Sequence, residues 1–362
     1  MQQQNDTMQK LSYWQQLAAS GRPLFLPDIG TYFNQDMQQA FTIVDALVSA
    51  GVTTIKGEIL QTANICLDES LSGNETYWGH ESSTKVEENY RQLIERKVVS
   101  LESYRALFAY VLAKDCDIIV SVYDFEGADF ALDMGCKAIK VASSNITHQP
   151  LIEYIATLNI PLIIDTGHSS NEEIARAVNW ARDAGLAAKQ ILVEHSPLGP
   201  PNPAELQNLN FMKTLGKSLG LAYGLSDHHT SDEMLYAATA MGAILLEKGV
   251  CPDSMGDEQD GGHALPVSQV AGVLQKVNSI ADAMGDGVRH LARDRVKYIS
   301  RMGLVAKQDL TPGDNVSLET VSFAFPVKGI ATEHWSEVKN YKIAKTLSKG
   351  QVIRWSDILL ED

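Results

Sequence analysis

The feature that most constrains the fold is an alternation of short apolar runs with amphipathic helical patterns, repeated eight times between residue 23 and about residue 250. The runs consist mostly of Val, Ile and Leu, as expected of strands that are buried on both faces of a parallel sheet. The predicted strands are Pro23–Ile29, Val52–Gly57, Cys116–Val122, Lys137–Ala142, Ile160–Thr166, Gln190–His195, Leu221–Ser226 and Ala243–Lys248. Eight strand–helix units favour an α/β fold closed as a (β/α)8 TIM barrel over an open doubly wound sheet.

Two of the intervening segments carry clear helix signals. In residues 171–184 apolar side chains recur on one helical face, Ser170 and Glu173 form a capping box, and Gly185 ends the pattern. Residues 37–49 show a second apolar face and are followed by a glycine. No Gly-x-Gly-x-x-Gly pattern follows the first predicted strand, so a dinucleotide-binding fold has no support.

The pattern changes in two places. Residues 60–114 form a long insertion between the second and third strands, predicted as a polar loop followed by helical segments at 87–94 and 100–113, and such loops often cover a barrel's site. After the eighth predicted helix the chain turns to short strands with Gly and Pro turns. We therefore expect a barrel domain over residues 1–292, a linker over 293–302 and a small β-rich domain over 303–362.

Composition excludes several classes of function. The net charge is −15 over 362 residues and no basic stripe is present to meet phosphates, which argues against a nucleic-acid partner. No apolar run approaches the length needed to span a bilayer, and the first residues do not resemble a secretion signal. The four cysteines show no CxxC pairing and are expected to be free thiols, so a cytoplasmic location is predicted.

Polar and charged side chains follow every predicted strand, at the end where barrel enzymes carry their chemistry. Two of them are histidines on neighbouring strands, His195 and His228, which we expect to ligate one divalent cation with positions left open for substrate. Asp227 would orient an imidazole from behind. A lone His195 would more often be a structural histidine, and the pairing is what favours metal binding. The other histidines are expected at the surface or in loops, with His263 as the exception.

Two lysines and two serines at the same strand ends form a candidate anion site. Lys56 and Lys140 supply positive charge, and Ser121 and Ser143 supply hydroxyl donors, for a phosphate or carboxylate. The alternative is that each lysine only extends out of the barrel end into solvent. Two lysines on the second and fourth strands point to the same side of a barrel, which weakens that alternative.

At these residues the chain resembles the N-acetylneuraminate (sialic acid) synthase family with a C-terminal SAF (antifreeze-like) domain. The similar segments, in order along the chain, are Lys140-Val141-Ala142-Ser143, Pro161-Leu162-Ile163-Ile164-Asp165-Thr166-Gly167, His195 with Pro201 and Asn208-Leu209, Gly224-Leu225-Ser226-Asp227-His228, Leu246-Glu247-Lys248 and Leu304-Val305-Ala306. Several motifs in one order, spread over nearly the whole chain, make the resemblance specific.

The resemblance implies a fold and a reaction. The fold would be a (β/α)8 barrel with a SAF domain, usually in a homodimer whose swapped SAF domain caps the partner's site. The reaction would condense phosphoenolpyruvate with a sugar aldehyde to give a 2-keto-3-deoxy sugar acid and phosphate. It would use a divalent metal, Mn²⁺ or alternatively Mg²⁺ or Co²⁺, as a Lewis acid.

The resemblance also assigns residues by position. His195 and His228 would ligate the metal, and Asp28 or Glu247 would position the attacking water. The phosphoenolpyruvate phosphate would be held by Lys56, Ser121, Lys140 and Ser143. Support of the metal ligands, or contact with substrate, is expected from Asp227, Asn145, Asp165 and Thr166.

The departures from the family pattern lie inside the site. They are Asp28 for a glutamate, Tyr32-Phe33-Asn34-Gln35 for an NHNG turn, Asn145 for a glutamate, Asp165 for a serine, Gly249 for a histidine and Phe325 for an arginine. Because they fall mostly on the sugar side, we predict an acceptor other than N-acetylmannosamine. Two alternatives stay open: a metal-dependent aldolase or lyase acting on an acidic or phosphorylated sugar, which Asp165 favours, and a non-catalytic paralogue that binds a sugar acid.

Overall fold

The computed structural model describes residues 11–30, 32–78, 84–197, 203–255, 261–289 and 300–359. It divides into two compact units, Met1–Asp286 and Gly287–Asp362, which are described separately. Residues 293–299 of the predicted linker lie outside the described residues. No helix in the described part of the chain combines the length and apolarity needed to cross a membrane.

The first unit is the predicted barrel. Its strands are β1 (Leu24–Asp28), β2 (Thr54–Ile59), β5 (Asp117–Val122), β6 (Ala138–Val141), β7 (Leu162–Asp165), β8 (Ile191–His195), β9 (Ala222–Asp227) and β10 (Leu245–Cys251). They pair in this order and in parallel, and the parallel pairing of β1 with β10 closes the ring. A short β11 (Leu265–Pro266) adds to β10. The (β/α)8 prediction is confirmed.

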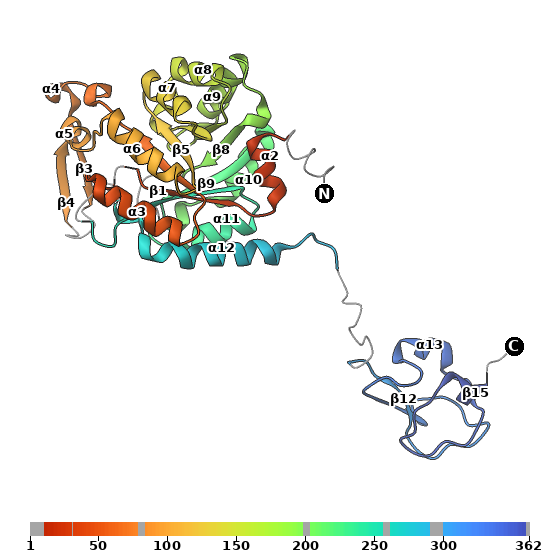
Figure 1. The fold of residues 1–362 in the computed structure, drawn as a ribbon. Coiled ribbons are helices and arrows are strands. Elements are labelled where there is room, and N and C mark those ends of the chain that lie inside the picture. The colour runs from red at the N-terminus through yellow and green to blue at the C-terminus, as the bar shows by residue number, and fades with distance from the viewer. Residues whose placement is uncertain are drawn as a thin grey trace. The chain divides into compact units, whose positions relative to one another are not determined.

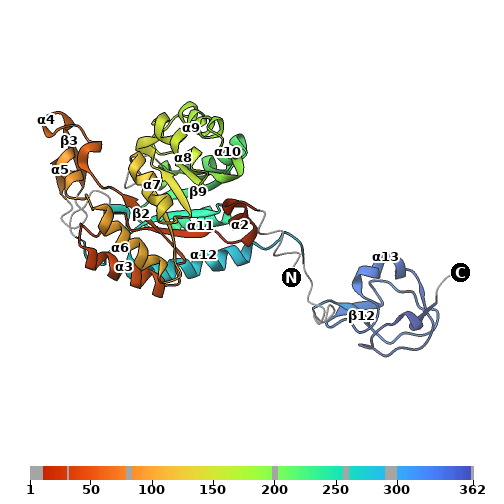
Figure 2. The same cartoon turned by 45° about the horizontal axis from the view of Figure 1, so that its top comes forward.

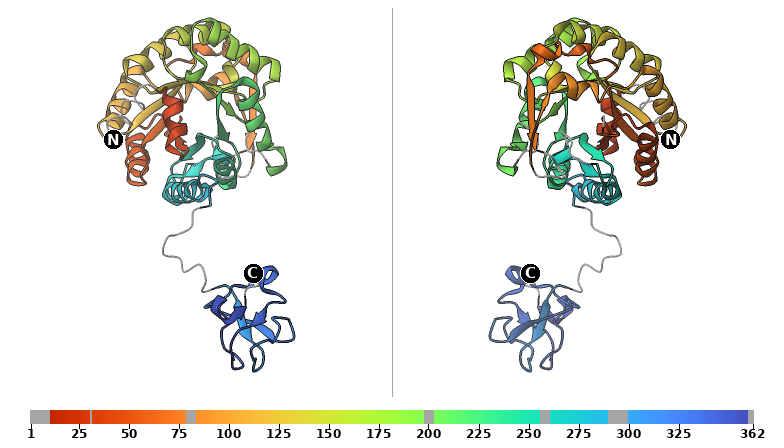
Figure 3. Two further views of the ribbon diagram at one scale, coloured as in Figure 1. Left: turned by 90° about the vertical axis from the view of Figure 1, so that its right-hand side faces the viewer. Right: turned by 90° about the vertical axis from the view of Figure 1, so that its left-hand side faces the viewer.

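The helices form an outer layer around these strands, as the views in Figure 3 show. They are α3 (Met37–Ser49), α6 (Leu101–Leu112), α7 (Phe125–Asp133), α8 (Gln149–Thr157), α9 (Asn171–Asp183), α10 (Leu209–Leu219), α11 (Glu233–Ala240) and α12 (Val270–Met284). The capping box predicted from Ser170 and Glu173 is present at the start of α9. Each helix buries one apolar face because every strand presents apolar side chains outward between the helices.

Strand side chains alternate between the interior of the barrel and the helix layer, as the pleat of a strand requires. The interior apolar layer is formed by Leu26, Ile119, Ala138, Ile163, Leu192 and Leu245, and it packs with Trp14. Trp14 belongs to α2 (Tyr13–Ser20), a helix that the sequence analysis did not predict, and its indole Nε1 donates to Gln190 O at 2.8 Å. Figures 1 and 2 show α2 at one end of the barrel. This end is therefore closed by apolar packing.

The insertion between β2 and β5 lies at the opposite end (Figure 1). It holds α4 (Glu69–Ser72), an antiparallel hairpin of β3 (Asn74–Trp78) and β4 (Lys85–Asn89), and α5 (Tyr90–Glu95). The helices predicted at 87–94 and 100–113 are present as α5 and α6. The predicted polar loop is wrong in part, because residues 85–89 pair with 74–78 as a hairpin and α5 begins only at Tyr90. Asn89 ends the hairpin and caps α5 through its side chain, which accepts from the amides of Arg91 and Gln92.

The second unit is small and mostly irregular. Its sheets are pairs of short antiparallel strands, β12 (Gly303–Ala306) with β13 (Val321–Ala324) and β14 (Lys342–Ile343) with β15 (Ile358–Leu359), and α13 (Trp335–Val338) is its short α-helix. The core of this unit consists of Leu304, Ala306, Leu310, Val316, Val321, Ile330, Val338, Ile343, Leu347, Ile353 and Ile358. The predicted β-rich domain is therefore a folding unit with its own apolar core.

Candidate functional site

The strand pleat determines which side chains reach the interior of the barrel at its carboxyl end. Two residues beyond the apolar layer, the same interior face of each strand carries a polar or charged side chain. The interior side chains at this level are Asp28, Lys56, Ser121, Lys140, Asp165, Glu194, Ser226 and Glu247. Four strands thus exchange an apolar residue for an acid within two positions, at Leu26–Asp28, Ile163–Asp165, Leu192–Glu194 and Leu245–Glu247.

A cavity of about 320 Å³ opens above this level, and we call it the mouth cavity. Its lining includes Asp28, Tyr32, Lys56, Glu58, Ser121, Tyr123, Lys140, Ser143, Asp165, Ser226, His228, Glu247 and His263. All four residues of the predicted anion site, Lys56, Ser121, Lys140 and Ser143, line this one cavity. The Ser121 hydroxyl is buried and has no hydrogen-bond partner within the described residues, so it is open to a ligand.

Lys140 lies at the centre of a group of carboxylates. Its Nζ lies 2.8 Å from Asp165 Oδ2, 2.8 Å from Glu194 Oε2 and 2.5 Å from Glu247 Oε1. The Ser226 hydroxyl lies 3.5 Å away. Burial alone would lower the pKa of Lys140, but the three carboxylates outweigh it and hold that pKa well above its usual value. Lys140 is therefore a permanently charged ammonium.

Lys56 is the second buried cation of the site. Its Nζ forms an ion pair with Asp28 and lies 3.6 Å from both Glu58 Oε1 and Glu247 Oε1. Burial raises the pKa of Asp28 to about 7 despite the nearby ammonium. The other carboxyl oxygen of Asp28, Oδ1, accepts from the amide of Gly30 at 2.8 Å. Asp28 therefore changes protonation near neutral pH, inside the cavity.

Glu194 is the acid that the sequence analysis did not select. It is fully buried on β8, directly beside Asp165 in the register of the sheet. Burial and the neighbouring Glu247 charge raise the pKa of Glu194 to about 8. The pKa values of Asp165 and Glu247 are lowered, because Lys140 outweighs the burial that would raise them. The signal that identifies Glu194 in the sequence is its spacing of two from the interior residue Leu192.

His195 points the other way. It follows Val193 in phase, on the strand face that packs against the helices. Its Nε2 lies 2.8 Å from Gln207 O, and its ring packs edge-on against Phe211 of α10 at 5.6 Å between centroids. Burial lowers the pKa of His195. His195 is not among the residues that line the mouth cavity.

His228 lies in the cavity wall, two residues beyond Ser226. Its Nδ1 lies 3.2 Å from Ser196 Oγ, and its ring packs edge-on against His263 with centroids 4.8 Å apart. His263 is buried, as the sequence analysis expected of the exceptional histidine, and burial holds its pKa well below the usual value. The two predicted metal ligands, His195 and His228, therefore lie in different environments, and their sharing of one metal ion stays a prediction.

The remaining predicted site residues are Asp227, Thr166 and Asn145. Asp227 lies outside the barrel interior, where its Oδ2 pairs with Lys248 Nζ at 2.9 Å, so the group it holds is an ammonium and not an imidazole. Thr166 donates from Oγ1 to Glu194 O at 3.0 Å. Asn145 lines a second cavity of about 550 Å³. This cavity shares Glu58, Tyr123 and Ser144 with the mouth cavity and extends toward the insertion.

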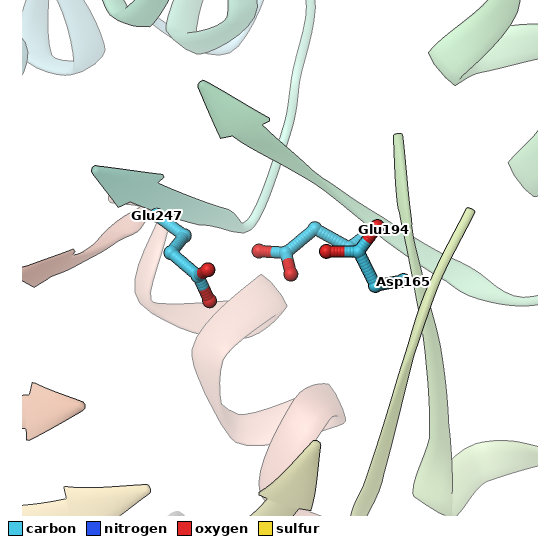
Figure 4. A group of neighbouring side chains, drawn as sticks. All are labelled: Asp165, Glu194 and Glu247. Atoms are coloured by element: carbon cyan, nitrogen blue, oxygen red, sulfur yellow. The ribbon is translucent and has the colours of Figure 1, made fainter. Parts of the chain in front are cut away.

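Three carboxylates of the site could hold a metal ion. Single oxygens of Asp165, Glu194 and Glu247, which we call the acidic triad, all lie within 4.8 Å of one another. Figure 4 shows the three side chains extending from their strands toward a common space. No group of three potential metal-binding side chains that includes a histidine is found within the described ranges. The common space of the triad is where the Lys140 ammonium lies, so a divalent ion does not fit there while Lys140 keeps its position.

Comparison with known proteins agrees with this architecture. A model of the NeuB family matches residues 43–289, and a model of the SAF domain matches residues 301–359. An N,N'-diacetyllegionaminic acid synthase of Campylobacter jejuni is 25% identical over 92% of this chain and 99% of its own. A pseudaminic acid synthase of Helicobacter pylori is 22% identical over 93% and 98%. The crystal structure of a spore coat polysaccharide biosynthesis protein E from Chromobacterium violaceum superposes with a TM-score of 0.71 at 21% identity, covering 94% of this chain and 100% of the other.

Proposed function

Because the chain belongs to the NeuB family, we propose that it condenses phosphoenolpyruvate with a sugar aldehyde to form a 2-keto-3-deoxy sugar acid and phosphate. The observation that carries this proposal is the mouth cavity, to which Lys56, Ser121, Lys140 and Ser143 all contribute. Relatives that match over nearly the whole chain are named as synthases of legionaminic and pseudaminic acid. Acids of this class are the products that we expect here.

Lys56 and Ser121 are the groups best placed to hold the phosphate. The Ser121 hydroxyl is buried without a partner, and a phosphate oxygen would give it one. Lys56 would exchange its contact with Asp28 for the phosphate, and Asp28 would then take up a proton, since its pKa already lies at about 7. Phosphate binding and proton uptake would therefore be coupled at this lysine.

The covalent steps need one water and leave the proton count balanced. C3 of phosphoenolpyruvate attacks the aldehyde carbon, and the aldehyde oxygen takes a proton to become a hydroxyl. Water then adds to the cationic C2 and loses a proton. Cleavage of the bond between C2 and the phosphate oxygen releases phosphate, which takes up the proton of the C2 hydroxyl as that hydroxyl becomes the 2-keto group. Asp28 lines the cavity and is protonated once phosphate takes over Lys56, so it is our candidate for the acid that gives its proton to the aldehyde oxygen. The carboxylate formed in that step can then receive the proton of the water. Glu247 would orient that water between Lys56 and Lys140.

The proposal of an altered acceptor is supported by two departures from the family pattern that contact each other at the cavity wall, Tyr32 and Gly249. A side chain at Gly249 would meet Tyr32 Oη at 2.6 Å from its Cβ, so Tyr32 occupies the space that a larger residue would need. Tyr32 itself lines the mouth cavity. The adjoining cavity, with Asn145 and His148 in its wall, offers the larger volume for a sugar. We propose that the acceptor binds there and is not N-acetylmannosamine.

Three further expectations stay proposals. A homodimer with swapped SAF domains and a cytoplasmic location are consistent with the SAF match and with the buried free thiols of Cys116, Cys136 and Cys251. The metal predicted from the sequence, Mn²⁺ or alternatively Mg²⁺ or Co²⁺, is given no step in this proposal. His195 faces away from the cavity, and the acidic triad surrounds a lysine.

The test is release of inorganic phosphate from phosphoenolpyruvate across a panel of aldoses, amino sugars and N-acetylated hexosamines, with Mn²⁺ and separately with EDTA. We expect release with at least one aldehyde and none without an acceptor. Lys56→Ala should lower the rate by about 100-fold, as the loss of one charge-stabilising donor does. Lys213→Ala, an exposed lysine on α10, is the matched control. If no aldehyde in the panel yields phosphate, the proposal is wrong.

A second candidate function is an aldolase or lyase acting on an acidic or phosphorylated sugar. It is favoured by the carboxylates Asp28, Glu58, Asp165, Glu194 and Glu247, which lie within 4 Å of one or both lysines and compete with a phosphate for them. This enzyme would cleave or form a carbon–carbon bond without releasing phosphate. A protein that binds such a sugar acid but turns nothing over would instead be the non-catalytic paralogue.

A further inference from the structure

The acidic triad has the layout of a cation site. Asp165, Glu194 and Glu247 come from β7, β8 and β10, and each side chain is at most 7% exposed. Three buried carboxylates that converge on one space repel one another strongly unless a cation lies between them. Carboxylate oxygens are the ligands that Mg²⁺, Ca²⁺ and Mn²⁺ prefer.

Here the cation is part of the chain. The Lys140 ammonium has three N–H donors, and its distances to the three carboxylates are 2.8, 2.8 and 2.5 Å. All three acids lie within ion-pair distance of Nζ, and Glu247 Oε1 also accepts a hydrogen bond from it. A divalent ion coordinated by the same oxygens would need to lie about 2.0–2.6 Å from them, which is the volume that Nζ already fills.

The lysine is held in this place by its surroundings. Lys140 is buried on the interior face of β6, one strand away from β7, and it is flanked on its other side by Ser121 of β5 in the sheet register. Glu247 is in addition 3.6 Å from Lys56, so the remaining negative charge of the triad is shared with a second ammonium. Withdrawal of Lys140 would leave these acids without their nearest positive charge.

We infer that the Lys140 ammonium takes the place of a divalent cation at the centre of this barrel, so that the acidic triad binds no metal in the wild-type protein. This inference concerns the residues of the triad and does not depend on the identity of the substrates.

The two histidines predicted as metal ligands lie outside the acidic triad. His195 lies with its ring against Phe211 and its Nε2 at Gln207 O, outside the residues that line the cavity. His228 is directed at Ser196 and His263. Neither histidine belongs to a group of three potential metal-binding side chains among the residues described.

The experiment compares Mn²⁺ binding by wild-type protein and Lys140→Met, using equilibrium dialysis and thermal unfolding with and without EDTA. Met has a similar length without the charge, so it empties the cation position and leaves the carboxylates. We expect Lys140→Met to gain one Mn²⁺ per chain with a Kd on the order of 10⁻⁵ M or tighter, and to be stabilised by it. Glu194→Gln should bind as much Mn²⁺ as wild-type protein, because the triad of the wild-type protein holds no ion.

Two controls make the result specific. Lys248→Met also removes a buried lysine, but Lys248 pairs with Asp227 outside the triad, so this variant should gain no ion. The double variant Lys140→Met with Glu194→Gln removes one triad carboxylate and should lose the gained ion. A Lys140→Met protein that folds but binds no Mn²⁺ would overturn the inference.

The wild-type measurement decides the question even if Lys140→Met does not fold. If wild-type protein binds one Mn²⁺ per chain and Glu194→Gln abolishes that binding, the metal displaces Lys140 and the inference is wrong. The inference stands if wild-type and Glu194→Gln proteins bind the same amount of Mn²⁺ and if each protein has the same unfolding midpoint with Mn²⁺ as with EDTA. The triad then holds no metal.

Discussion

The two ends of the barrel are built from the same strands and differ by only two positions along each. At the amino end the interior layer is apolar and is sealed by Trp14 of α2. At the carboxyl end the next interior residues are acids, lysines and serines, with a cavity above them. Both layers are buried, so burial is not what separates them. The difference is that one layer gains free energy from burial and the other must balance its charges internally.

The polar layer at the carboxyl end of the barrel is less stabilising than an apolar layer would be. Apolar side chains such as Leu192 and Ile163 would be the stabilising choice at the carboxyl end as well, since they already fill the layer below. Asp165, which Lys140 keeps ionised, and Glu194, whose pKa burial raises to about 8, stand there instead. Buried charged groups of this kind are retained where they serve function, and in TIM barrels the functional site lies at the carboxyl ends of the strands.

The largest effect is expected from breaking the charge balance of the polar layer at the carboxyl end of the barrel. Lys140→Met leaves three carboxylates without their shared cation, and removal of one partner of a buried ion pair costs about 3–5 kcal/mol. Denaturant unfolding in EDTA measures this loss, and phosphate release should be abolished. Unchanged stability in Lys140→Met would show that the acids are already neutral in the folded protein.

The next effect tests the lower layer. Ile163→Ala removes a fully buried side chain two residues before Asp165, and such a truncation costs about 2–5 kcal/mol through lost burial and the cavity left behind. Because Ile163 lies beneath the site and not in it, the folded fraction of this variant should keep the wild-type KM. A changed KM would mean that the two layers are mechanically coupled.

The fold could be predicted because its signal is local and repeated. Each strand is a continuous apolar run and each helix has one apolar face, so eight units could be identified without long-range information. The helix α2 was missed since its importance depends on Trp14 fitting under a barrel that closes far along the chain. The hairpin of β3 and β4 was missed because its strands are polar, and only pairing distinguishes them from a loop.

The site was predictable in its composition but not in its contacts. The ring of polar strand ends led to the correct cavity residues, including Lys56, Lys140 and Ser143. The interior position of Glu194 follows from the two-residue period of the strand, which places Glu194 in phase with Leu192 and His195 out of phase. The contact of Lys140 with Glu247 joins residues 107 positions apart, and no local pattern identifies such a partner.

The third prediction concerns His195 of β8 and His228, which directly follows β9. His195→Ala leaves the buried Gln207 carbonyl without its partner, which costs about 1–3 kcal/mol of stability. Phosphate release by the folded protein should persist, because His195 does not face the cavity. His228→Ala, in the cavity wall, should lower the rate. Equal loss of activity in both variants would favour the metal site predicted from the sequence.

A smaller effect is expected from pH, through Asp28 at the upper layer. Its pKa is about 7 in the free protein, and a bound phosphate that takes over Lys56 raises this pKa further. The complex then holds one proton more than the free protein above pH 7, so the Kd for phosphoenolpyruvate should rise by up to about tenfold per pH unit between pH 7 and 8.5. Asp28→Asn should bind more tightly at pH 8.5 and show a flatter profile, as calorimetric titration can measure.

The smallest effect is expected from an ion pair at the amino end, just before β1. Arg22 pairs with Asp282 of α12 through a bidentate contact, with Nη2 at 2.7 and 2.9 Å from the two carboxyl oxygens. Its geometry is as good as that of the Lys140 contacts, but both side chains are more than half exposed, so water already solvates the charges when the pair is broken. Arg22→Ala should therefore lower the free energy of unfolding by less than about 1 kcal/mol, and less still at high salt. A loss as large as that of Lys140→Met would mean that position in the barrel, and not burial, sets the strength of these pairs.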